Sequence, residues 1–327
     1  MVRVLDATQV ASLLDIGELL SVIETALIKQ GRGEVVRPER PHFPVGAGLD
    51  PDRPDEALGT GLTMPAYVHG SDYYATKLVG FFEGNPARDL PTITAQIVVN
   101  EADTGLPVAV MDGTHVTGMR TGCIGGLAAR ELATEPVDLG VVGAGTQARW
   151  QTRAIAAATD VERVRVYSPS DSRFDCASEL DDDLDAPVEA VDSARAAVEG
   201  ATAVVTATPA ESPVLDGDWL APGTLVVAVG AFSPEMQELD PRTFDRASQV
   251  FADVPEEVTD TGDVIAAELA DGAIGSLADA LEGTAGRDDA DEIIVVESVG
   301  SAVFDAATAA YIVELAEAAD VGTTVEL

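Results

Sequence analysis

One junction near the middle of the chain constrains its fold more than any other feature. An apolar run at 137–142 leads into a G-x-G-x-x-A segment at 143–148 and then into a helix-forming stretch. In this spacing the first glycine permits a tight turn, the second lets a pyrophosphate approach the backbone, and the small last residue allows close packing of helix on strand. The start of such a helix also offers amide donors and a positive dipole to phosphates. We therefore predict a dinucleotide site here, with contacts from Gly143, Gly145, Thr146, Gln147 and Ala148.

The chain after residue 136 alternates between strand-like and helix-like segments. Apolar runs at 161–167, 203–207, 225–229 and 293–296 are separated by segments long enough to form helices. This alternation is typical of a parallel sheet with helices on both faces. The predicted fold class is therefore α/β, with a Rossmann dinucleotide-binding domain over 117–300.

The remaining residues predict a second domain of α+β type. Residues 7–30 show the apolar spacing of helices, and 36–110 contains short β-prone runs divided by Pro, Gly and Asn turns. A helix expected over 117–133 carries Arg120 in its first turn. The small-residue helix expected over 301–319 returns to this first domain.

The charge balance excludes several kinds of partner. The chain carries 57 acidic and 19 basic residues, a formal net charge of −38, which repels nucleic acid and anionic membranes. The acidic residues are spread along a chain rich in Val, Ala, Leu and Ile, so they indicate a folded protein with an acidic surface rather than a disordered tail. Such a surface is typical of halophilic proteins, which work in concentrated salt.

Other composition features favour the cytoplasm. No apolar stretch approaches the roughly 18 residues that a membrane span requires, and no basic segment followed by an apolar one opens the sequence. Cys123 and Cys176 are too few for a disulfide framework. The two cysteines and three histidines have no metal-ligand spacing, so no metal site is predicted, and nothing marks Cys123 as a nucleophile.

The end of the second Rossmann strand bears on the choice of dinucleotide. NAD-binding folds usually carry an acidic residue there, about 20 residues past the glycine motif, to hold the ribose 2′-hydroxyl. Here Ser168 stands in its place, followed by Ser170 and Arg173. Hydroxyls beside a guanidinium suit a 2′-phosphate, so we predict NADP. Asp171 keeps NAD open as an alternative.

Ordered motifs along nearly the whole chain resemble the ornithine cyclodeaminase/mu-crystallin family. The matching segments are 37–40, 64–66, 76–79, 90–92, 104–107, 110–113, 117–121, 143–148, 207–209, 229–231 and 238–240. The resemblance implies a substrate-binding and dimerisation domain formed by 1–116 and 301–327, a Rossmann domain between these segments, and a homodimer. The activities it implies are ornithine cyclodeaminase, alanine dehydrogenase and reductase of cyclic ketimines such as pyrroline-2-carboxylate and piperideine-2-carboxylate.

The resemblance also implies a site for the substrate carboxylate. Its R-x-x-R, T-K and T-x-x-R-T segments place Arg40, Lys77 and Arg120 there, and we predict Lys77 and Arg120 to be catalytic as well. The chain has two lysines, Lys29 and Lys77, so a surviving lysine is a stronger candidate than usual. Fixing the carboxylate of a small amino or imino acid with cations aligns its α-carbon for hydride transfer and makes an imine carbon more electrophilic.

Further residues complete the predicted cofactor site. Thr208, Gly230 and Val299 follow later strands, at the edge where a Rossmann fold contacts the nicotinamide half. Cyclodeaminases and alanine dehydrogenases of the family carry an aspartate where this chain has Phe232, and cyclodeaminases add a glutamate where it has Leu62. Without these acids an amine has no proton acceptor, whereas a preformed cyclic imine needs none and packs against Phe232.

We therefore predict an NAD(P)-dependent reductase of cyclic ketimines. Ornithine cyclodeaminase and alanine dehydrogenase are the alternatives within the family. A non-catalytic, NADP-dependent ligand-binding protein is the alternative from another class, because mu-crystallin relatives bind hormone. Intact Lys77 and Arg120 favour catalysis.

The charge count predicts salt-dependent folding. In dilute buffer acidic self-repulsion acts over a Debye length of about 30 Å, which shrinks to about 3 Å in molar salt. Circular dichroism should therefore report loss of secondary structure on dialysis from molar KCl into dilute buffer. A spectrum that stays unchanged would refute the prediction.

Overall fold

A computed structural model of the chain describes residues 1–270 and 272–326, which form two compact units. The first unit comprises Met1–Asp15, Arg32–Arg120 and the C-terminal segment from Ala302. The second comprises Ile16–Gly31 and Thr121–Ser301. Helix α3 (Gly113–Leu132) is shared, with its residues up to Arg120 counted in the first unit.

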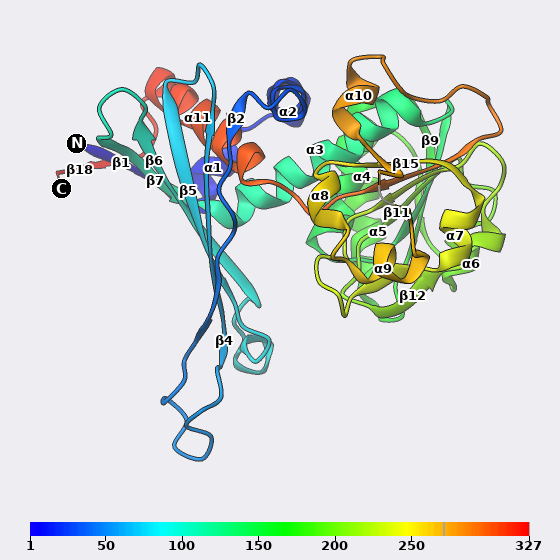
Figure 1. Cartoon of the computed structure of the whole chain (residues 1–327), viewed down its shortest axis with the longest axis horizontal. Coiled ribbons are helices and arrows are strands. Elements are labelled where there is room, and N and C mark those ends of the chain that lie inside the picture. The colour runs from blue at the N-terminus through cyan, green and yellow to red at the C-terminus, as the bar shows by residue number, and fades with distance from the viewer. Residues whose placement is uncertain (271, 327) are drawn as a thin grey trace. The chain divides into compact units, whose positions relative to one another are not determined.

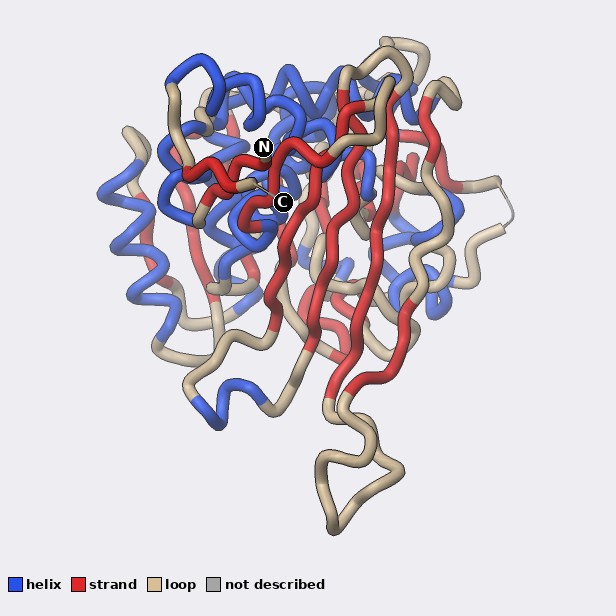
Figure 2. Tube along the Cα trace, turned by 90° about the vertical axis from the view of Figure 1, so that its left-hand side faces the viewer, coloured by secondary structure: helices blue, strands red, loops and turns tan. Residues whose placement is uncertain are grey.

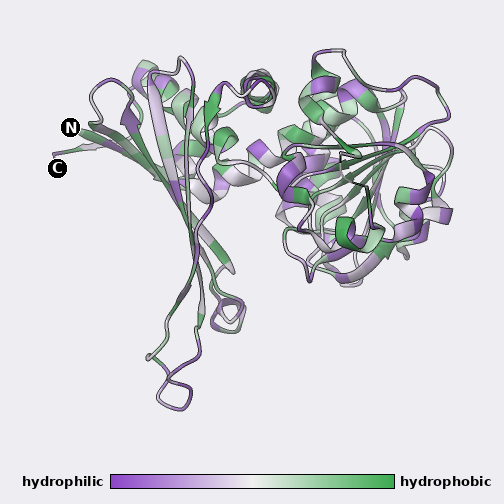
Figure 3. Cartoon of the chain, viewed as in Figure 1, coloured by the Kyte–Doolittle hydropathy of each residue, from purple (hydrophilic) through white to green (hydrophobic). Residues whose placement is uncertain are grey.

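The second unit contains the predicted parallel sheet (Figure 1). Its strand order is β10 (Val188–Ala190), β9 (Val161–Tyr167), β8 (Val137–Val142), β11 (Ala203–Thr206), β13 (Leu225–Ala228), β17 (Ile293–Glu297), β15 (Ala247–Ala252) and β16 (Ile274–Ser276). Every pairing in it is parallel. Each residue of β11, β13 and β17 is buried, as expected of strands covered on both faces, and these strands are green in Figure 3. The α/β fold class is confirmed.

Helices pack around this sheet. They are α4 (Thr146–Ala158), α5 (Ser172–Asp183), α6 (Ala194–Val198), α7 (Pro241–Arg246), α8 (Pro255–Val258), α9 (Gly262–Ala267) and α10 (Leu277–Leu281). A separate two-stranded sheet joins β12 (Glu211–Leu215) to β14 (Gln237–Leu239). The first five strands of the large sheet follow the 3-2-1-4-5 order of a Rossmann fold, which places the β8–α4 turn near its middle.

The first unit is built on a mostly antiparallel sheet, whose long strands lie side by side in Figure 2. Its order is β18 (Thr323–Val325), β1 (Val2–Leu5), β7 (Pro107–Asp112), β6 (Ile93–Glu101), β5 (Tyr73–Phe81), β4 (Gly59–Val68) and β2 (Val35–Val36), and β3 (His42–Val45) also pairs with β4. Helices α1 (Ala7–Leu13) and α11 (Ala302–Ala319) accompany it, and α11 packs on β4 and β5. The last helix thus lies against the sheet of the first unit.

Two expectations about helices need correction. The apolar pattern at 7–30 predicted one helical region of the first domain, but α1 ends at Leu13 and α2 (Ile16–Gly31) belongs to the second unit, where it packs against α4 and α10. Helical spacing identifies an apolar face but not the element that covers it. Helix α3 begins at Gly113 because the Asp112 carboxylate accepts the His115 amide at 2.8 Å, so Arg120 lies two turns from the helix start.

Four buried carboxyl groups lie near the carboxyl ends of strands in the second unit. Asp253 accepts from Ser298 Oγ at 2.7 Å and from the Gly300 amide at 2.9 Å. Asp263 Oδ1 accepts two backbone amides at 2.7 Å each. Burial raises the pKa of Asp263 to about 6 and that of Glu238 to about 7. Burial and then the charges of the other three acids raise the pKa of Glu297 well above its ordinary value.

These carboxyl groups predict a fold that loses stability as the pH rises. A pKa raised in the folded state contributes stability below the unfolded value of about 4, and this is lost as the pH rises through the folded values near 6 and 7. Urea unfolding in molar KCl should show a free energy of unfolding lower by roughly 4 kcal/mol at pH 8 than at pH 5. Glu297→Gln should flatten this dependence and stabilise the protein at pH 8, while Glu211→Gln, at an exposed position, should not. An equal slope in both variants would contradict the prediction.

Candidate active site

Lys77 lies in an apolar row of the first unit's sheet. The strand register sets Lys77 between Met64 on β4 and Ile97 on β6, and Met111 on β7 continues the row. Successive side chains of a strand face opposite sides, so these residues share the face on which α11 packs. Lys77 is only 3% exposed. An ammonium group in such surroundings requires partners.

The partner is Asp305, in the first turn of α11. Its Oδ2 lies 2.5 Å from Lys77 Nζ, and its Oδ1 accepts from Arg120 Nε at 2.9 Å. Arg120 and Asp305 are 4% and 1% exposed, so all three charges are buried together. The site thus joins a strand, α3 and the last helix, and it brings the two predicted catalytic cations onto one carboxylate.

Asp305 was missed in the sequence. Its only local signal is an acidic residue among the small apolar residues that open α11, where a carboxylate also suits the helix dipole. A pairing partner 185 residues away from Arg120 leaves no trace in local periodicity.

The electrostatics of this cluster leave donors for a ligand. Burial lowers the pKa of Lys77 to about 8, with Arg120 acting in the same direction and Asp305 opposing both. Lys77 Nζ also donates to Thr117 Oγ1 at 3.2 Å. Arg120 Nη1 is buried without a hydrogen-bond partner among the described residues. An unpaired buried guanidinium N–H is costly, and a carboxylate is the ligand that best satisfies it.

The remaining residues considered for the substrate come from the segment before β3, from β4 and from the second unit. Arg40 is half-buried in the segment between β2 and β3, two strands that both pair with β4. Leu62 shares the Lys77 face of β4 by alternation from Met64. Phe232 belongs to the second unit and follows β13, with 56% of its surface exposed. The roles of Arg40 and Phe232 remain predictions.

The β8–α4 turn has the geometry that a pyrophosphate requires. Gly143 has φ +125°, and a Cβ there would lie 2.4 Å from the Ala207 carbonyl oxygen, so only glycine fits. A Cβ on Gly145 would meet no atom of the described chain within 4 Å, which leaves open space beside the backbone. Thr146 opens α4, a helix of 13 residues, and Ala148 is fully buried against the sheet. Gln147 is half-buried on the same first turn.

The segment after β9 gathers hydroxyls and one guanidinium. Ser168 Oγ lies 3.3 Å from Ser170 Oγ, which lies 2.6 Å from Ser172 Oγ. Arg173 donates to the carbonyl oxygens of Ser168 and Ser170 at 3.3 and 2.9 Å, and its charge lies over the Phe174 ring. Its Nε is buried without a partner in the part of the chain described. This set can bind an additional phosphate.

Buried acids hold the remaining predicted cofactor residues in place. Glu238 accepts from the Thr208 amide and hydroxyl at 2.7 and 2.8 Å and from the Gly230 amide at 2.7 Å. Asp253 accepts from the Val299 amide at 3.2 Å. The carboxyl groups therefore fix the loops that follow β11, β13 and β17, a positioning role that the sequence did not reveal.

The structure gives no sign of a cysteine nucleophile, a metal site or a membrane span in the part of the chain that it describes. Burial raises the pKa of Cys123 to about 12, which suppresses its thiolate at neutral pH. Among the described residues no group of three His, Cys, Asp or Glu side chains is placed to hold a metal ion. No helix within 1–270 or 272–326 is long and apolar enough to cross a membrane.

Comparison with known proteins gives consistent matches along the full length. A sequence model of the ornithine cyclodeaminase/mu-crystallin family matches residues 2–320. An alanine dehydrogenase of Archaeoglobus fulgidus is 31% identical over 99% of this chain and 98% of its own. The Δ1-pyrroline-2-carboxylate/Δ1-piperideine-2-carboxylate reductase of Azospirillum brasilense is 34% identical over 94% of this chain and 93% of its own. The structure of a Thermococcus litoralis Δ1-pyrroline-2-carboxylate reductase with NADH and L-proline has a TM-score of 0.91 at 32% identity, covering 99% of this chain and 100% of that one.

Proposed function

The chain belongs to the ornithine cyclodeaminase/mu-crystallin family, and we propose that it is an NAD(P)-dependent reductase of cyclic ketimines such as pyrroline-2-carboxylate. The observation that carries the proposal is the buried Lys77–Asp305–Arg120 cluster with its unpaired Arg120 Nη1. The Thermococcus relative was solved with L-proline, the product of such a reduction, and with NADH.

The cluster acts on the substrate carboxylate. Lys77 and Arg120 bind it with charge-assisted hydrogen bonds, and Arg40 adds a second guanidinium. Because the carboxylate is attached to the imine carbon, fixing it orients that carbon, and the nearby cations increase its electrophilicity. The nicotinamide cofactor, when bound, supplies the hydride. The turn at 143–148 would hold its pyrophosphate, and Thr208, Gly230 and Val299 would contact its nicotinamide half.

NADP is the cofactor that the β9 end favours. The hydroxyls of Ser168 and Ser170 and the Arg173 guanidinium suit a 2′-phosphate, and no acidic side chain stands at the position of Ser168. The solved relatives were described with NADH and with NAD, so NAD is the alternative.

Alanine dehydrogenase is the second candidate activity, because the Archaeoglobus relative matches over nearly the whole chain. It requires removal of a proton from an ammonium group. Phe232 and Leu62, both apolar, stand where the family's amine-handling acids are expected, and this favours a substrate whose nitrogen is already part of a ring.

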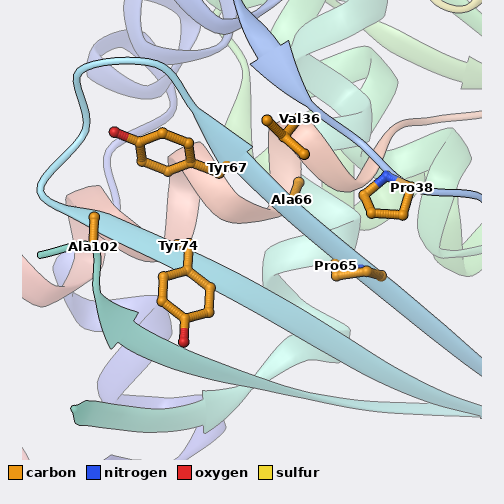
Figure 4. A pocket seen from close by; sticks show the side chains of 7 residues that line it. All are labelled: Val36, Pro38, Pro65, Ala66, Tyr67, Tyr74 and Ala102. Carbon is orange, nitrogen blue, oxygen red and sulfur yellow. The ribbon is translucent and has the colours of Figure 1, made fainter. Parts of the chain in front are cut away.

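A homodimer suits the uncovered face of the first unit's sheet. Pro65, Tyr67 and Tyr74 face away from Lys77 and line an apolar pocket of about 360 Å³ (Figure 4). Phe43 on β3 pairs with Gly61, so it lies on this same face, and it is 47% exposed. Exposed apolar surface of this kind marks association sites, and an archaeal alanine dehydrogenase relative is described as a dimer.

The cofactor proposal predicts tighter binding of NADPH than of NADH. Ser168→Asp should reverse this order, because a carboxylate accepts from the 2′-hydroxyl and repels the 2′-phosphate. Dissociation constants from nucleotide fluorescence in molar KCl measure both. Ser193→Asp, at a helix cap elsewhere in the unit, is the control and should leave the order unchanged. Equal affinities in the starting protein would exclude the preference.

The activity is tested by a substrate panel in molar KCl. Oxidation of NADPH and NADH is followed with pyrroline-2-carboxylate, piperideine-2-carboxylate, and pyruvate plus ammonia, and ornithine is assayed separately for ammonia release. We expect cyclic imine reduction to be fastest. Release of ammonia from ornithine at a higher rate would show that the interpretation of Phe232 and Leu62 is wrong.

Variants of the same enzyme connect the activity to the cluster. Lys77→Ala and Arg120→Ala should each lower kcat/KM at least about tenfold with dinucleotide binding retained, since a charge-assisted contact contributes about 1.5 to 3 kcal/mol. Lys29→Ala removes the other lysine and should leave turnover normal. Normal turnover in either cluster variant would remove that residue from the proposed site.

A further inference from the structure

The two cations of the proposed substrate site do not stand alone. Asp305 divides its carboxylate between them, with Oδ2 2.5 Å from Lys77 Nζ and Oδ1 2.9 Å from Arg120 Nε. The charged groups that act on Lys77 come from two elements, Arg120 from α3 and Asp305 from α11. The neutral Thr117 hydroxyl is its third contact.

The arrangement separates the donors that hold the site from those that remain for a ligand. Arg120 uses Nε for Asp305, while its buried Nη1 has no partner among the described residues. Lys77 has three N–H donors, of which Asp305 and Thr117 account for two. Asp305 therefore pairs with both cations, and donors remain on each, on Arg120 Nη1 and on Lys77 Nζ.

We propose that Asp305 is a positioning residue of this site, which keeps Lys77 charged and fixes the Arg120 guanidinium so that both present donors to a ligand carboxylate. This inference rests on the proposed function for the identity of the ligand. It goes beyond that function because it assigns a role to Asp305, without which the two cations would not both stay charged and oriented toward the ligand. Two like charges in a buried site disfavour each other, and burial disfavours both, so the carboxylate is what maintains the pair.

Because the chain has two lysines, the pKa of Lys77 can be measured directly by NMR. In protein labelled with [13Cε]lysine, NMR resolves Lys29 and Lys77, and Lys29→Arg assigns them. We expect a Lys77 pKa near 8 in the unliganded protein. Asp305→Asn should lower it by about one unit or more, because an opposite charge at this distance is lost. Asp305→Glu keeps the charge and should largely restore the value.

Thr308→Val is the matched control on the same helix. Thr308 is buried one turn beyond Asp305, and its hydroxyl has no hydrogen-bond partner within the described residues. This variant should leave the Lys77 pKa unchanged. Circular dichroism and dinucleotide binding verify that each variant is folded.

The pH dependence of KM gives a second test, because a purely structural role of Asp305 would not change it. Lys77 binds the carboxylate when protonated, and in Asp305→Asn it loses its proton at lower pH. The ratio of the KM for pyrroline-2-carboxylate in Asp305→Asn to that in wild type should therefore grow between pH 6 and pH 8. In Asp305→Glu the displaced Arg120 should raise KM by the same factor at every pH.

The outcomes distinguish this inference from the proposed function. A Lys77 pKa unchanged in Asp305→Asn, or a KM ratio independent of pH, overturns the positioning role. If no cyclic imine is reduced by the wild-type enzyme, the proposed function fails while the NMR titration still decides the role of Asp305. Should Asp305→Asn not fold, Arg120→Met replaces it: removal of the second cation should raise the Lys77 pKa, and no change would overturn the coupling.

Discussion

A buried charge must be paired, and this constraint ties the first unit together. Lys77, Arg120 and Asp305 come from a central strand, α3 and the last helix, and each is almost completely buried. Loss of one partner leaves an uncompensated charge, which costs about 3 to 5 kcal/mol. These ion pairs join the last helix to a sheet formed some 200 residues earlier, and so link distant segments of a unit that is discontinuous in sequence.

Much of the fold could be predicted because its signals are local. The central strands of the Rossmann sheet follow apolar runs, and β8 and β9 have the predicted bounds. Short strands such as β1 and β18 were not predicted, because three or four residues carry no readable period and their pairing joins the two ends of the chain. The placement of α2 in the second unit was not predicted either, because an apolar helix face does not show which part of the protein packs against it.

The candidate site could be predicted only in part, where a residue type that is rare in the chain or a family motif indicates a role. Lys77 stood out because the chain contains two lysines, and family motifs added Arg120. Asp305 could not be found this way: in a chain with 57 acidic residues one more carboxylate carries no information. Glu238 is a similar case. Its motif was recognised, but its four hydrogen bonds, to the end of β11 and to the loops after β11 and β13, depend on tertiary structure.

The acidic composition gives a physical reason for burying the cations of this site. At a net charge of −38 the surface repels a carboxylate substrate, and exposed cations would be screened within about 3 Å in molar salt. Cations removed from solvent are screened much less by salt, so they keep more of their attraction for a carboxylate. Burial carries the desolvation cost that lowers the Lys77 pKa, and Asp305 offsets it. In the proposed function, the internal carboxylate of Asp305 thus enables the two buried cations to bind the carboxylate of the substrate.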